Sequence, residues 1–461
     1  MLWQKEDEGQ KMRIDLGRPM TLEEIALATG GSHPHQNAVI RSITTDSREA
    51  KRGDLFIAIK GDKFDGTNFA SEVRKMGGFV LSNNPLYSDI LHQNSNDTLL
   101  SLANHYIKTL PYILYKIGIT GSVGKTTTKE FLKALVSQRY KTHASEGNFN
   151  SQIGMPMSVL SAAEDTQVLI MEMGMNHPGE IARLSRCLMP DISIITNIGT
   201  AHIGNLGSRE NIAKAKLEIT IGMNNGKLFI PADEPLLSQE KNSVRFSLTD
   251  NSADCFIKQK ANRSVSVYKS GALYTNANYC IPGKNNLKCL LPAVSVAIEL
   301  GITPAELSKR ISTITEDIIR QKLICRENLY FYTDFYNASR ESVLSFVAEA
   351  YETKPDGKKS LLLGDILELG DMSDDIHYEI GKAISYSTFS NLFLFGNYTS
   401  YVRLGAIEGG FPPDRIFVNT DMSDPLLSAM QIRQNCNAGD MIFMKASRGL
   451  RLERILDCFT L

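Results

Sequence analysis

A glycine-rich segment with one lysine and two threonines is the part of this sequence best suited to chemistry. It spans residues 120–127 (Thr-Gly-Ser-Val-Gly-Lys-Thr-Thr) and lies between an apolar strand predicted over 113–120 and a helix predicted over 125–139. In such a loop, backbone N–H groups and the helix N-terminus surround phosphate groups. Lys125 would reach the β- and γ-phosphates, and the Thr126 hydroxyl would ligate Mg²⁺. The segment predicts a nucleotide site, but alone it does not distinguish an ATPase, a GTPase, a kinase and a ligase. The residues expected around the phosphates are Gly121, Ser122, Val123, Gly124, Lys125, Thr126 and Thr127.

Two further polar residues follow short apolar segments typical of buried strands. Glu172 follows residues 168–171, and His202 comes shortly after residues 192–196. Open α/β sheets bind ligands at the carboxyl ends of their parallel strands, so this carboxylate and imidazole could hold a second Mg²⁺ there. Taken alone, His202 is equally well explained as a loop histidine and Glu172 as a helix cap. Lys216, by itself, is better explained as a lysine on the solvent-exposed face of a helix.

Strands and helices alternate along most of the chain, which predicts an α/β fold with doubly wound, mostly parallel sheets. At roughly 100–200 residues per domain, the length suggests about three domains. We predict a small α/β domain over 1–107, a central phosphate-loop domain over 108–316 and a Rossmann-like α/β domain over 317–461.

Composition limits the classes of partner and the compartment. Lys plus Arg (50) nearly equals Asp plus Glu (51), so no bulk charge is available to attract nucleic acid or an anionic membrane. The seven cysteines include no CxxC pair, which indicates reduced thiols and not a disulfide framework or a zinc site. The charged N-terminal segment is unlike a signal peptide, and no apolar run approaches the roughly 18 residues of a transmembrane helix. We therefore expect a soluble, cytoplasmic protein without membrane insertion.

Several segments, in their order along the chain, resemble motifs of the Mur ligases, enzymes of bacterial cell-wall synthesis. The loop 120–127 is similar to the family form TG[ST]xGKT[TS], which explains why Ile119 stands where the general phosphate-loop pattern has its first glycine. Three later segments, 147–156, 172–180 and 196–202, resemble GNxNxxIGxP, EMGxNxPGEI and TNIGxAH.

The resemblance extends over nearly the whole chain. Residues 215–218 resemble AKxE, 334–338 resemble D[DS]YNA, 363–370 resemble LGDMLELG and 445–449 resemble KASRG. In the first domain, residues 45–66 are similar to the family's uridine-nucleotide segment, DSRxxxxGDLFxAxxGxxxDG. Each motif is of limited specificity, but their shared order is not expected by chance.

The closest resemblance is to the family member that joins D-alanyl-D-alanine to UDP-N-acetylmuramoyl-tripeptide. It implies a UDP-substrate domain, an ATP-binding domain and a C-terminal ligand-binding domain, with ATP and Mg²⁺ as cofactors. We expect a monomer, and the charge balance predicts no nucleic-acid partner. In the implied reaction, the tripeptide carboxylate attacks the γ-phosphate of ATP, and the amine then attacks the resulting acyl-phosphate.

The resemblance also assigns roles to individual residues. The catalytic residues would be Lys125, Glu172, His202, Lys216 and Arg320. Besides the loop, ATP would contact Asn286, Arg320, Asp334, Tyr336 and Asn337. The UDP-substrate would contact Ser47, Arg48, Phe56, Asn148 and Asn150, and the acceptor or phosphate would contact Lys445 and Ser447. The metal ligands would be Thr126, Glu172, His202 and Lys216, the lysine as a carbamate that supplies negative charge.

Some positions depart from the family pattern, and two other functions stay open. Asn285 and Cys289 replace a histidine and an asparagine of GxHNxxN, and Ile319 replaces the glycine before Arg320. The alternatives are another Mur-type or folylpolyglutamate-type ligase, and a phosphate-loop binding protein that has lost turnover. The uridine-like segment and the 363–370 stretch weigh against the folate alternative.

Overall fold

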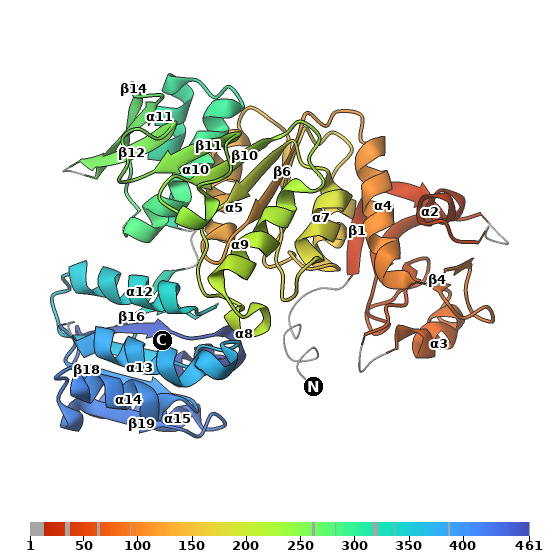
Figure 1. Ribbon diagram of the computed structural model, residues 1–461. Helices are drawn as coiled ribbons and strands as arrows, with labels where there is room; N and C mark the ends of the chain where they lie inside the picture. Colours follow the sequence, from red (N-terminus) through yellow and green to blue (C-terminus); the bar gives the residue numbers. More distant parts are fainter. Residues whose placement is uncertain are drawn as a thin grey trace.

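Three β-sheets organise the computed structural model, which describes residues 13–32, 37–61, 65–92, 94–260, 263–281, 283–316, 321–335, 337–385 and 388–460. Within these ranges the sheets contain five, nine and six strands, each accompanied by helices (Figure 1). This arrangement confirms the predicted α/β fold class with three sheet regions. The domain boundaries near residues 107 and 316 stay a prediction. Ile319, Arg320 and Tyr336 lie outside the described residues.

The first sheet has the strand order β1-β2-β3-β4-β5, with β1 antiparallel to β2 and the other pairs parallel. Thr21 starts the helix after β1, because its side-chain oxygen accepts a hydrogen bond from Glu24 N at 3.1 Å. The elements are β1 (Arg13–Thr21), α2 (Leu22–Thr29), β2 (Val39–Thr44), β3 (Leu55–Ile57), η1 (Gly66–Phe69), α3 (Ala70–Lys75), β4 (Phe79–Ser82), β5 (Ile90–Leu91) and α4 (Ser95–Thr109).

The central sheet has the order β14-β13-β12-β11-β10-β9-β6-β8-β7. Its strands from β7 to β12 pair in parallel, and β12, β13 and β14 form an antiparallel end. Strands β8 and β9 are buried along their whole length, as expected where helices cover both faces of a sheet. The elements are β6 (Tyr115–Thr120), α5 (Lys125–Val136), β7 (Thr142–Ala144), α6 (Gly154–Leu160), β8 (Val168–Glu172), α7 (Glu180–Leu188), β9 (Ile192–Ile195), α8 (Ile203–Leu206), α9 (Arg209–Leu217), η2 (Glu218–Thr220), β10 (Lys227–Pro231), η3 (Pro235–Leu237), β11 (Ser243–Ser247), β12 (Cys255–Lys260), β13 (Ser264–Lys269), β14 (Ala272–Asn278), α10 (Lys284–Glu299) and α11 (Pro304–Ser312).

The third sheet has the order β15-β16-β20-β17-β18-β19, parallel except for the pairing of β15 with β16. Ser339 starts α12 with a capping box, in which it and Ser342 satisfy each other's backbone N–H groups. The elements are β15 (Lys322–Arg326), β16 (Leu329–Asp334), α12 (Arg340–Glu352), β17 (Lys359–Gly364), η5 (Gly370–Met372), α13 (Ser373–Ser385), β18 (Asn391–Phe395), α14 (Thr399–Glu408), η6 (Pro413–Arg415), β19 (Ile416–Asn419), α15 (Pro425–Asn435), β20 (Met441–Lys445), η7 (Arg448–Leu450) and α16 (Glu453–Leu456).

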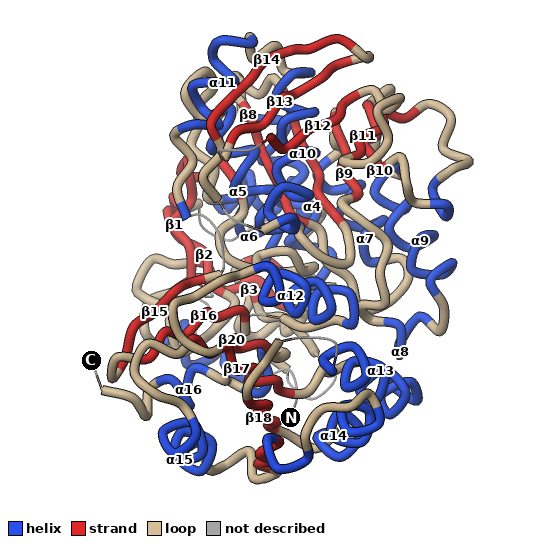
Figure 2. The backbone as a smooth tube through the Cα atoms, turned by 90° about the vertical axis from the view of Figure 1, so that its left-hand side faces the viewer, coloured by secondary structure: helices blue, strands red, loops and turns tan. Residues whose placement is uncertain are grey.

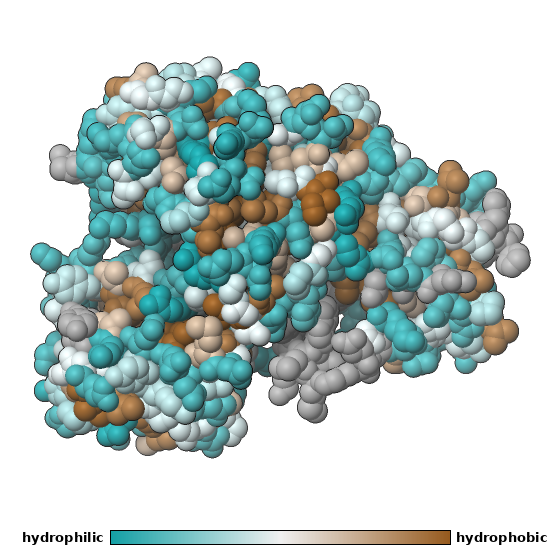
Figure 3. All heavy atoms as spheres, viewed as in Figure 1, coloured by the Kyte–Doolittle hydropathy of each residue, from teal (hydrophilic) through white to brown (hydrophobic). Residues whose placement is uncertain are grey.

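The part of the chain around the third sheet lies against the part around the central sheet, with α12 on the side that faces the central part (Figures 1 and 2). We call these the third part and the central part, and we call the part of the chain around the first sheet the first part. The surface is hollowed between them (Figure 3). No described helix is both long and apolar enough to cross a bilayer.

Candidate active site

The loop between β6 and α5 depends on two glycines in backbone conformations that other residues rarely adopt. Gly121 has φ 150° and Gly124 has φ 82°. A Cβ atom on Gly121 would collide with the hydroxyl of Thr196, which follows β9. Glycine is therefore required at this position both for conformation and for space.

The end of β9 holds the loop in shape. Asn197 Oδ1 accepts a hydrogen bond from Val123 N at 2.8 Å, and the Asn197 carbonyl accepts one from Ser122 N at 3.2 Å. The Thr196 hydroxyl donates to the Val123 carbonyl at 2.6 Å. These contacts exist because β9 pairs directly with β6 in the sheet. Asn197 thus supports the phosphate loop; it lies in the segment that resembles TNIGxAH but was not among the expected site residues.

Lys125, Thr126 and Glu172 lie together at the carboxyl ends of neighbouring strands β6 and β8. Lys125 Nζ donates to the Gly121 carbonyl at 2.8 Å, which folds the lysine back over the loop. The Thr126 hydroxyl donates to Glu172 Oε2 at 2.5 Å, and Asn150 Nδ2 donates to Glu172 Oε1 at 2.8 Å. A hydroxyl and a carboxylate are hard oxygen ligands of the kind that Mg²⁺ prefers, so this pair fits the metal. Asn150, expected at the UDP-substrate, here contacts Glu172.

Lys216 is buried, with 2% of its surface exposed, so the alternative of a solvent-exposed helix lysine is wrong. Burial, and secondarily the charge of Lys125, lower the pKa of Lys216 well below its ordinary value. No described residue accepts a hydrogen bond from its amine. Because the neutral form of an amine is the one that reacts with carbon dioxide, the lowered pKa of Lys216 favours the expected carbamate.

His202 lies apart from Glu172 and contacts the third part. Its Nδ1 is 2.7 Å from Glu368 Oε2, in the loop between β17 and η5. The close approach of the His202 ring lowers the pKa of Glu368 and so favours its ionised form. His202 and Glu368 line a small cavity together with Ser447 and Arg448, which we call the second cavity. Glu172 lines a different, larger cavity, and joint ligation of one metal by Glu172 and His202 stays a prediction.

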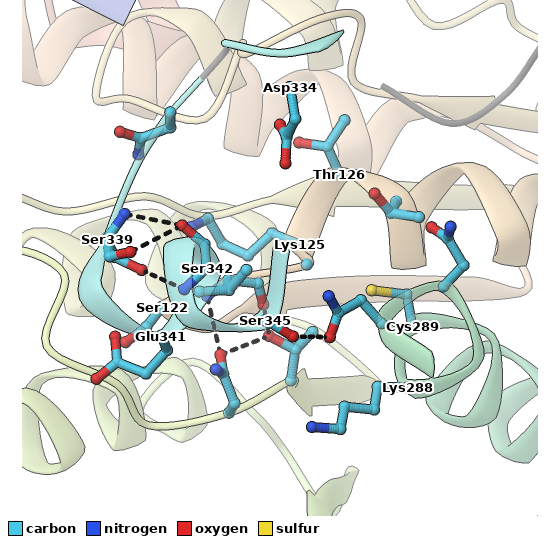
Figure 4. A pocket seen from close by; sticks show the side chains of 18 of the residues that line it. Ser122, Lys125, Thr126, Lys288, Cys289, Asp334, Ser339, Glu341, Ser342 and Ser345 are labelled. Atoms are coloured by element: carbon cyan, nitrogen blue, oxygen red, sulfur yellow. Dashed lines mark hydrogen bonds between the residues drawn. The ribbon is translucent and has the colours of Figure 1, made fainter. Parts of the chain in front are cut away.

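A larger cavity opens between the phosphate loop and the third part and encloses about 1240 Å³, including open solvent at its mouth. Side chains from both parts face it (Figure 4). Besides the loop, the residues that line it include Glu172, Asn285, Asn286, Lys288, Cys289, Gln321, Asp334, Asn337, Ser339, Glu341, Ser342, Ser345 and Lys445.

Residues of the third part expected to bind ATP and acceptor hold one another in place. Lys445 is buried, and its Nζ donates to Asp334 Oδ2 at 2.8 Å and to the Asn337 carbonyl at 3.1 Å. The ion pair places Lys445 in the larger cavity, with Asp334 and Asn337. The Ser447 hydroxyl accepts from Leu367 N at 2.9 Å and lies in the second cavity. The structure therefore separates Lys445 and Ser447 into two adjacent cavities.

The expected UDP-substrate residues of the first part differ in accessibility. Ser47 and Arg48 lie in the turn after β2, and the mostly exposed Arg48 side chain donates to Asp46 Oδ1 at 2.9 Å. Phe56 instead packs in a small apolar core with Val73 and Val80 and is 1% exposed. The Phe56 side chain therefore supports the sheet, and a contact of this residue with the UDP-substrate stays a prediction. Asn148, in the loop after β7, is partly exposed.

Two departures from the family pattern lie in the larger cavity. Asn285 accepts a hydrogen bond from Ser345 of α12, which joins the central part to the third part. Cys289 lies so near the phosphate loop that a Cβ atom on Gly124 would be 2.7 Å from its sulfur. Glu341, which no sequence pattern indicated, accepts a hydrogen bond from the Thr200 hydroxyl at 3.1 Å.

Comparison with known proteins identifies the class. The Mur ligase middle domain matches residues 119–297, and the model of the Mur ligase family catalytic domain matches residues 39–81. A relative from Bacillus subtilis (strain 168) is 34% identical over 450 residues, which cover 94% of this chain and 96% of the relative. The chain belongs to the Mur ligase family, which confirms the resemblance found in the sequence.

The relatives also indicate the branch of the family. The Bacillus subtilis protein is a UDP-N-acetylmuramoyl-tripeptide–D-alanyl-D-alanine ligase. The crystal structure of MurF from Acinetobacter baumannii superposes with a TM-score of 0.85 at 26% identity, covering 96% of this chain and 99% of that one. MurF ligase from Thermotoga maritima in complex with ADP superposes with a TM-score of 0.78 at 26% identity, covering 90% and 96%.

Proposed function

We propose that this chain is an ATP-dependent ligase that joins D-alanyl-D-alanine to UDP-N-acetylmuramoyl-tripeptide in peptidoglycan synthesis. The observation that carries the proposal is one cavity in which Lys125, Thr126 and Glu172 face the third part. Nearly full-length similarity to ligases of this name supports the choice of substrates.

The phosphate loop would hold ATP, with Lys125 on the β- and γ-phosphates and Asn286, Asp334 and Asn337 toward the nucleoside. Thr126, Glu172 and a carbamylated Lys216 would hold Mg²⁺, which would neutralise charge during phosphoryl transfer. The Thermotoga maritima relative in complex with ADP supports binding of an adenine nucleotide by this chain.

In the first step, an oxygen of the tripeptide carboxylate bonds to the γ-phosphorus as the bond to the bridging oxygen breaks and ADP leaves. Two anions meet here, so the positive charge of Lys125 and the backbone N–H groups of the loop must stabilise the transferring phosphoryl group. Arg320 would add a second cation. The product is an acyl-phosphate, whose carbonyl carbon is a far better electrophile than that of a carboxylate.

In the second step, the dipeptide amine bonds to the carbonyl carbon, phosphate leaves, and the amine loses a proton. The second cavity shares Asn337, Ala338 and Ser339 with the larger one, which makes it a suitable entry for the acceptor. Ser447 would contact the acceptor there. Closure of the third part would exclude water, which would otherwise hydrolyse the acyl-phosphate.

The test is phosphate release measured with UDP-N-acetylmuramoyl-tripeptide and a panel of amines. Release should require both the UDP-tripeptide and D-alanyl-D-alanine, and one amide should form per phosphate. Equal turnover with L-alanine or D-glutamate as the amine would instead favour another ligase of the family. Absence of turnover with every acceptor would favour a binding protein.

A further inference from the structure

Three of the described residues that line the larger cavity carry a carboxylate, and two of these carboxylates have evident partners. Asp334 forms an ion pair with Lys445 at 2.8 Å. Glu172 accepts a hydrogen bond from the Thr126 hydroxyl and belongs to the expected metal site. The third carboxylate is that of Glu341, in the first turn of α12, and the proposed function does not use it.

Glu341 reaches across the junction from the third part to the central part. Its Oε2 accepts a hydrogen bond from the Thr200 hydroxyl at 3.1 Å. A hydroxyl is an uncharged donor, and no lysine, arginine or histidine of the described residues forms an ion pair with this carboxylate. Within the described part of the chain, the negative charge of Glu341 therefore has no cationic partner.

The carboxylate lies close to the phosphate loop. A Cβ atom on Gly199 would be 2.9 Å from Glu341 Oε2 and 3.2 Å from Ser122 Cβ, so both side chains meet the same side of this glycine. Gly199 N donates to Ser122 Oγ at 2.9 Å. Figure 4 shows Glu341 beside Ser122 at the larger cavity. The absence of a side chain at position 199 allows the carboxylate to come this near the loop.

Glu341 also lies where the two cavities adjoin. Ser339, two residues earlier in the chain, lines both cavities, and Ala201, directly after Thr200, lines the second cavity. An acceptor that enters through the second cavity would therefore pass Glu341 on its way to the acyl-phosphate. Its amino group must reach this place for the carbon–nitrogen bond to form.

A carboxylate beside bound phosphates would repel them unless a cation lies between the two. The acceptor can supply this cation, because an α-amino group has a pKa of about 8 and is mostly protonated at neutral pH. An ammonium group and a carboxylate form a strong, charge-assisted hydrogen bond. An ammonium group has no lone pair, however, so it must lose a proton before it can attack a carbonyl carbon.

We propose that Glu341 is a catalytic residue that binds the ammonium group of the acceptor and takes its first proton. The nitrogen lone pair then bonds to the carbonyl carbon of the acyl-phosphate, and the bond from that carbon to the phosphate oxygen breaks. The nitrogen loses two protons in all: the first passes through Glu341 to solvent, and the second goes to the departing phosphate. The proposal rests on the proposed function in requiring that an amine attacks an acyl-phosphate in this cavity.

The test compares two acceptors in Glu341→Gln. With D-alanyl-D-alanine, kcat/KM should fall by at least about a hundredfold, the lower end of what a general base supplies. Hydroxylamine is uncharged at neutral pH and attacks acyl-phosphates without a base. Hydroxamate formation from the UDP-tripeptide should therefore stay at the wild-type rate. The KM values for ATP and for the UDP-tripeptide should also be unchanged, because the first step does not involve Glu341.

The variants separate the charge of Glu341 from its contact with the central part. Glutamine at 341 can still accept a hydrogen bond from the Thr200 hydroxyl, so this contact is kept while the proton acceptor is lost. Glu341→Ala removes both. It should lose the same activity with the dipeptide, and it decides the matter if Glu341→Gln does not fold.

Glu352→Gln is the matched control. Glu352 lies on the same helix and bridges the same junction, with Oε1 3.3 Å from Lys284 Nζ of α10. It is not among the described residues that line the larger cavity. This variant should keep the wild-type values with both acceptors.

A second measurement isolates the first step if the wild type does not accept hydroxylamine. In the presence of the UDP-tripeptide and without an acceptor, reversal of acyl-phosphate formation transfers label from ADP into ATP. Glu341→Gln should keep the wild-type rate of this exchange.

Three results would overturn the inference. The first is an unchanged kcat/KM for the dipeptide in folded Glu341→Gln or Glu341→Ala. The second is an equal loss with both acceptors, or a loss of the exchange, which would assign Glu341 to the first step. The third is the same loss in Glu352→Gln. A wild-type chain that uses only another amine would overturn the proposed acceptor alone, and the same variants are then measured with that amine. A wild-type chain that is inactive with every amine would overturn both proposals.

Discussion

Replacing Lys216 by methionine should make the folded chain more stable at neutral pH and also inactive. Methionine has similar length and no polar atom, so it fills the same buried space. In the wild type, an amine without a described hydrogen-bond acceptor is 2% exposed, and leaving such a group unsatisfied costs about 1–3 kcal/mol. The variant should gain at least that much in free energy of unfolding.

The pH dependence gives a sharper test. The pKa of Lys216 is lowered in the folded chain, first by burial and then by Lys125. Between the folded value and the ordinary value of 10.5, the unfolded chain therefore binds more protons, and the stability that the wild type derives from this group rises with pH. The free energy of unfolding changes by at most about 1.4 kcal/mol per pH unit for one such group. The stability advantage of Lys216→Met over the wild type should therefore shrink as pH rises through that window.

The assay is denaturant unfolding of wild type and Lys216→Met at several pH values, followed by a probe in the central part. A difference between the two proteins that does not vary with pH would refute the lowered pKa of Lys216. Added bicarbonate with Mg²⁺ should stabilise the wild type and leave the variant unchanged if a carbamate forms. In the same series, Lys216→Ala should be nearly inactive and partly rescued by short-chain carboxylic acids, and full activity of Lys216→Ala would return the residue to a non-catalytic role.

Three further predictions concern separate parts of the molecule. Lys125→Ala should lose at least about a thousandfold in phosphate release, roughly 4 kcal/mol, with an unchanged circular dichroism spectrum; near-normal turnover would exclude the loop as the ATP site. Tyr106→Phe removes a buried hydroxyl that donates to the Ala162 carbonyl at 2.7 Å. Urea unfolding should show a free energy of unfolding lower by about 1–3 kcal/mol, with unaltered KM values. An unchanged urea midpoint would contradict this. Glu368→Gln removes the contact with His202 and should destabilise by less than about 1 kcal/mol at pH 7, since the carboxylate is 42% exposed. Because the folded pKa of Glu368 is lowered, this difference should vanish as pH falls below the range in which a glutamate ionises, and a deficit that persists in acid would rule out the ion pair.

Local features of the chain were readily predicted from sequence. The loop 120–127 follows a strand and precedes a helix, and its glycines and its lysine determine the backbone conformation over a few residues. The same holds for Glu172, which ends a continuous apolar strand in both the prediction and the structure. The strand–helix alternation likewise determined the α/β class, because the hydrophobic period of each segment depends on near neighbours alone.

The tertiary structure determined which other residues these local segments contact. Asn197 supports the phosphate loop only because β9 lies beside β6, and Glu341 reaches Thr200 only because α12 packs against the central part. Lys216 has the sequence context of an exposed helix lysine and is nevertheless buried.

Phe56 and His202 likewise show which properties depend on the local sequence and which depend on the tertiary structure. The motif around Phe56 predicts a substrate segment, but the packing of the first part directs this side chain into its core. His202 follows a strand as predicted, yet its contact with Glu368 depends on how the third part sits on the central one. Sequence determined which residues have the chemistry and where each strand and helix forms, because those properties depend on local conformation. Which side chains share a cavity was decided by the order of strands in the sheets and by the packing between parts, which bring together residues as far apart in the chain as Lys125 and Lys445.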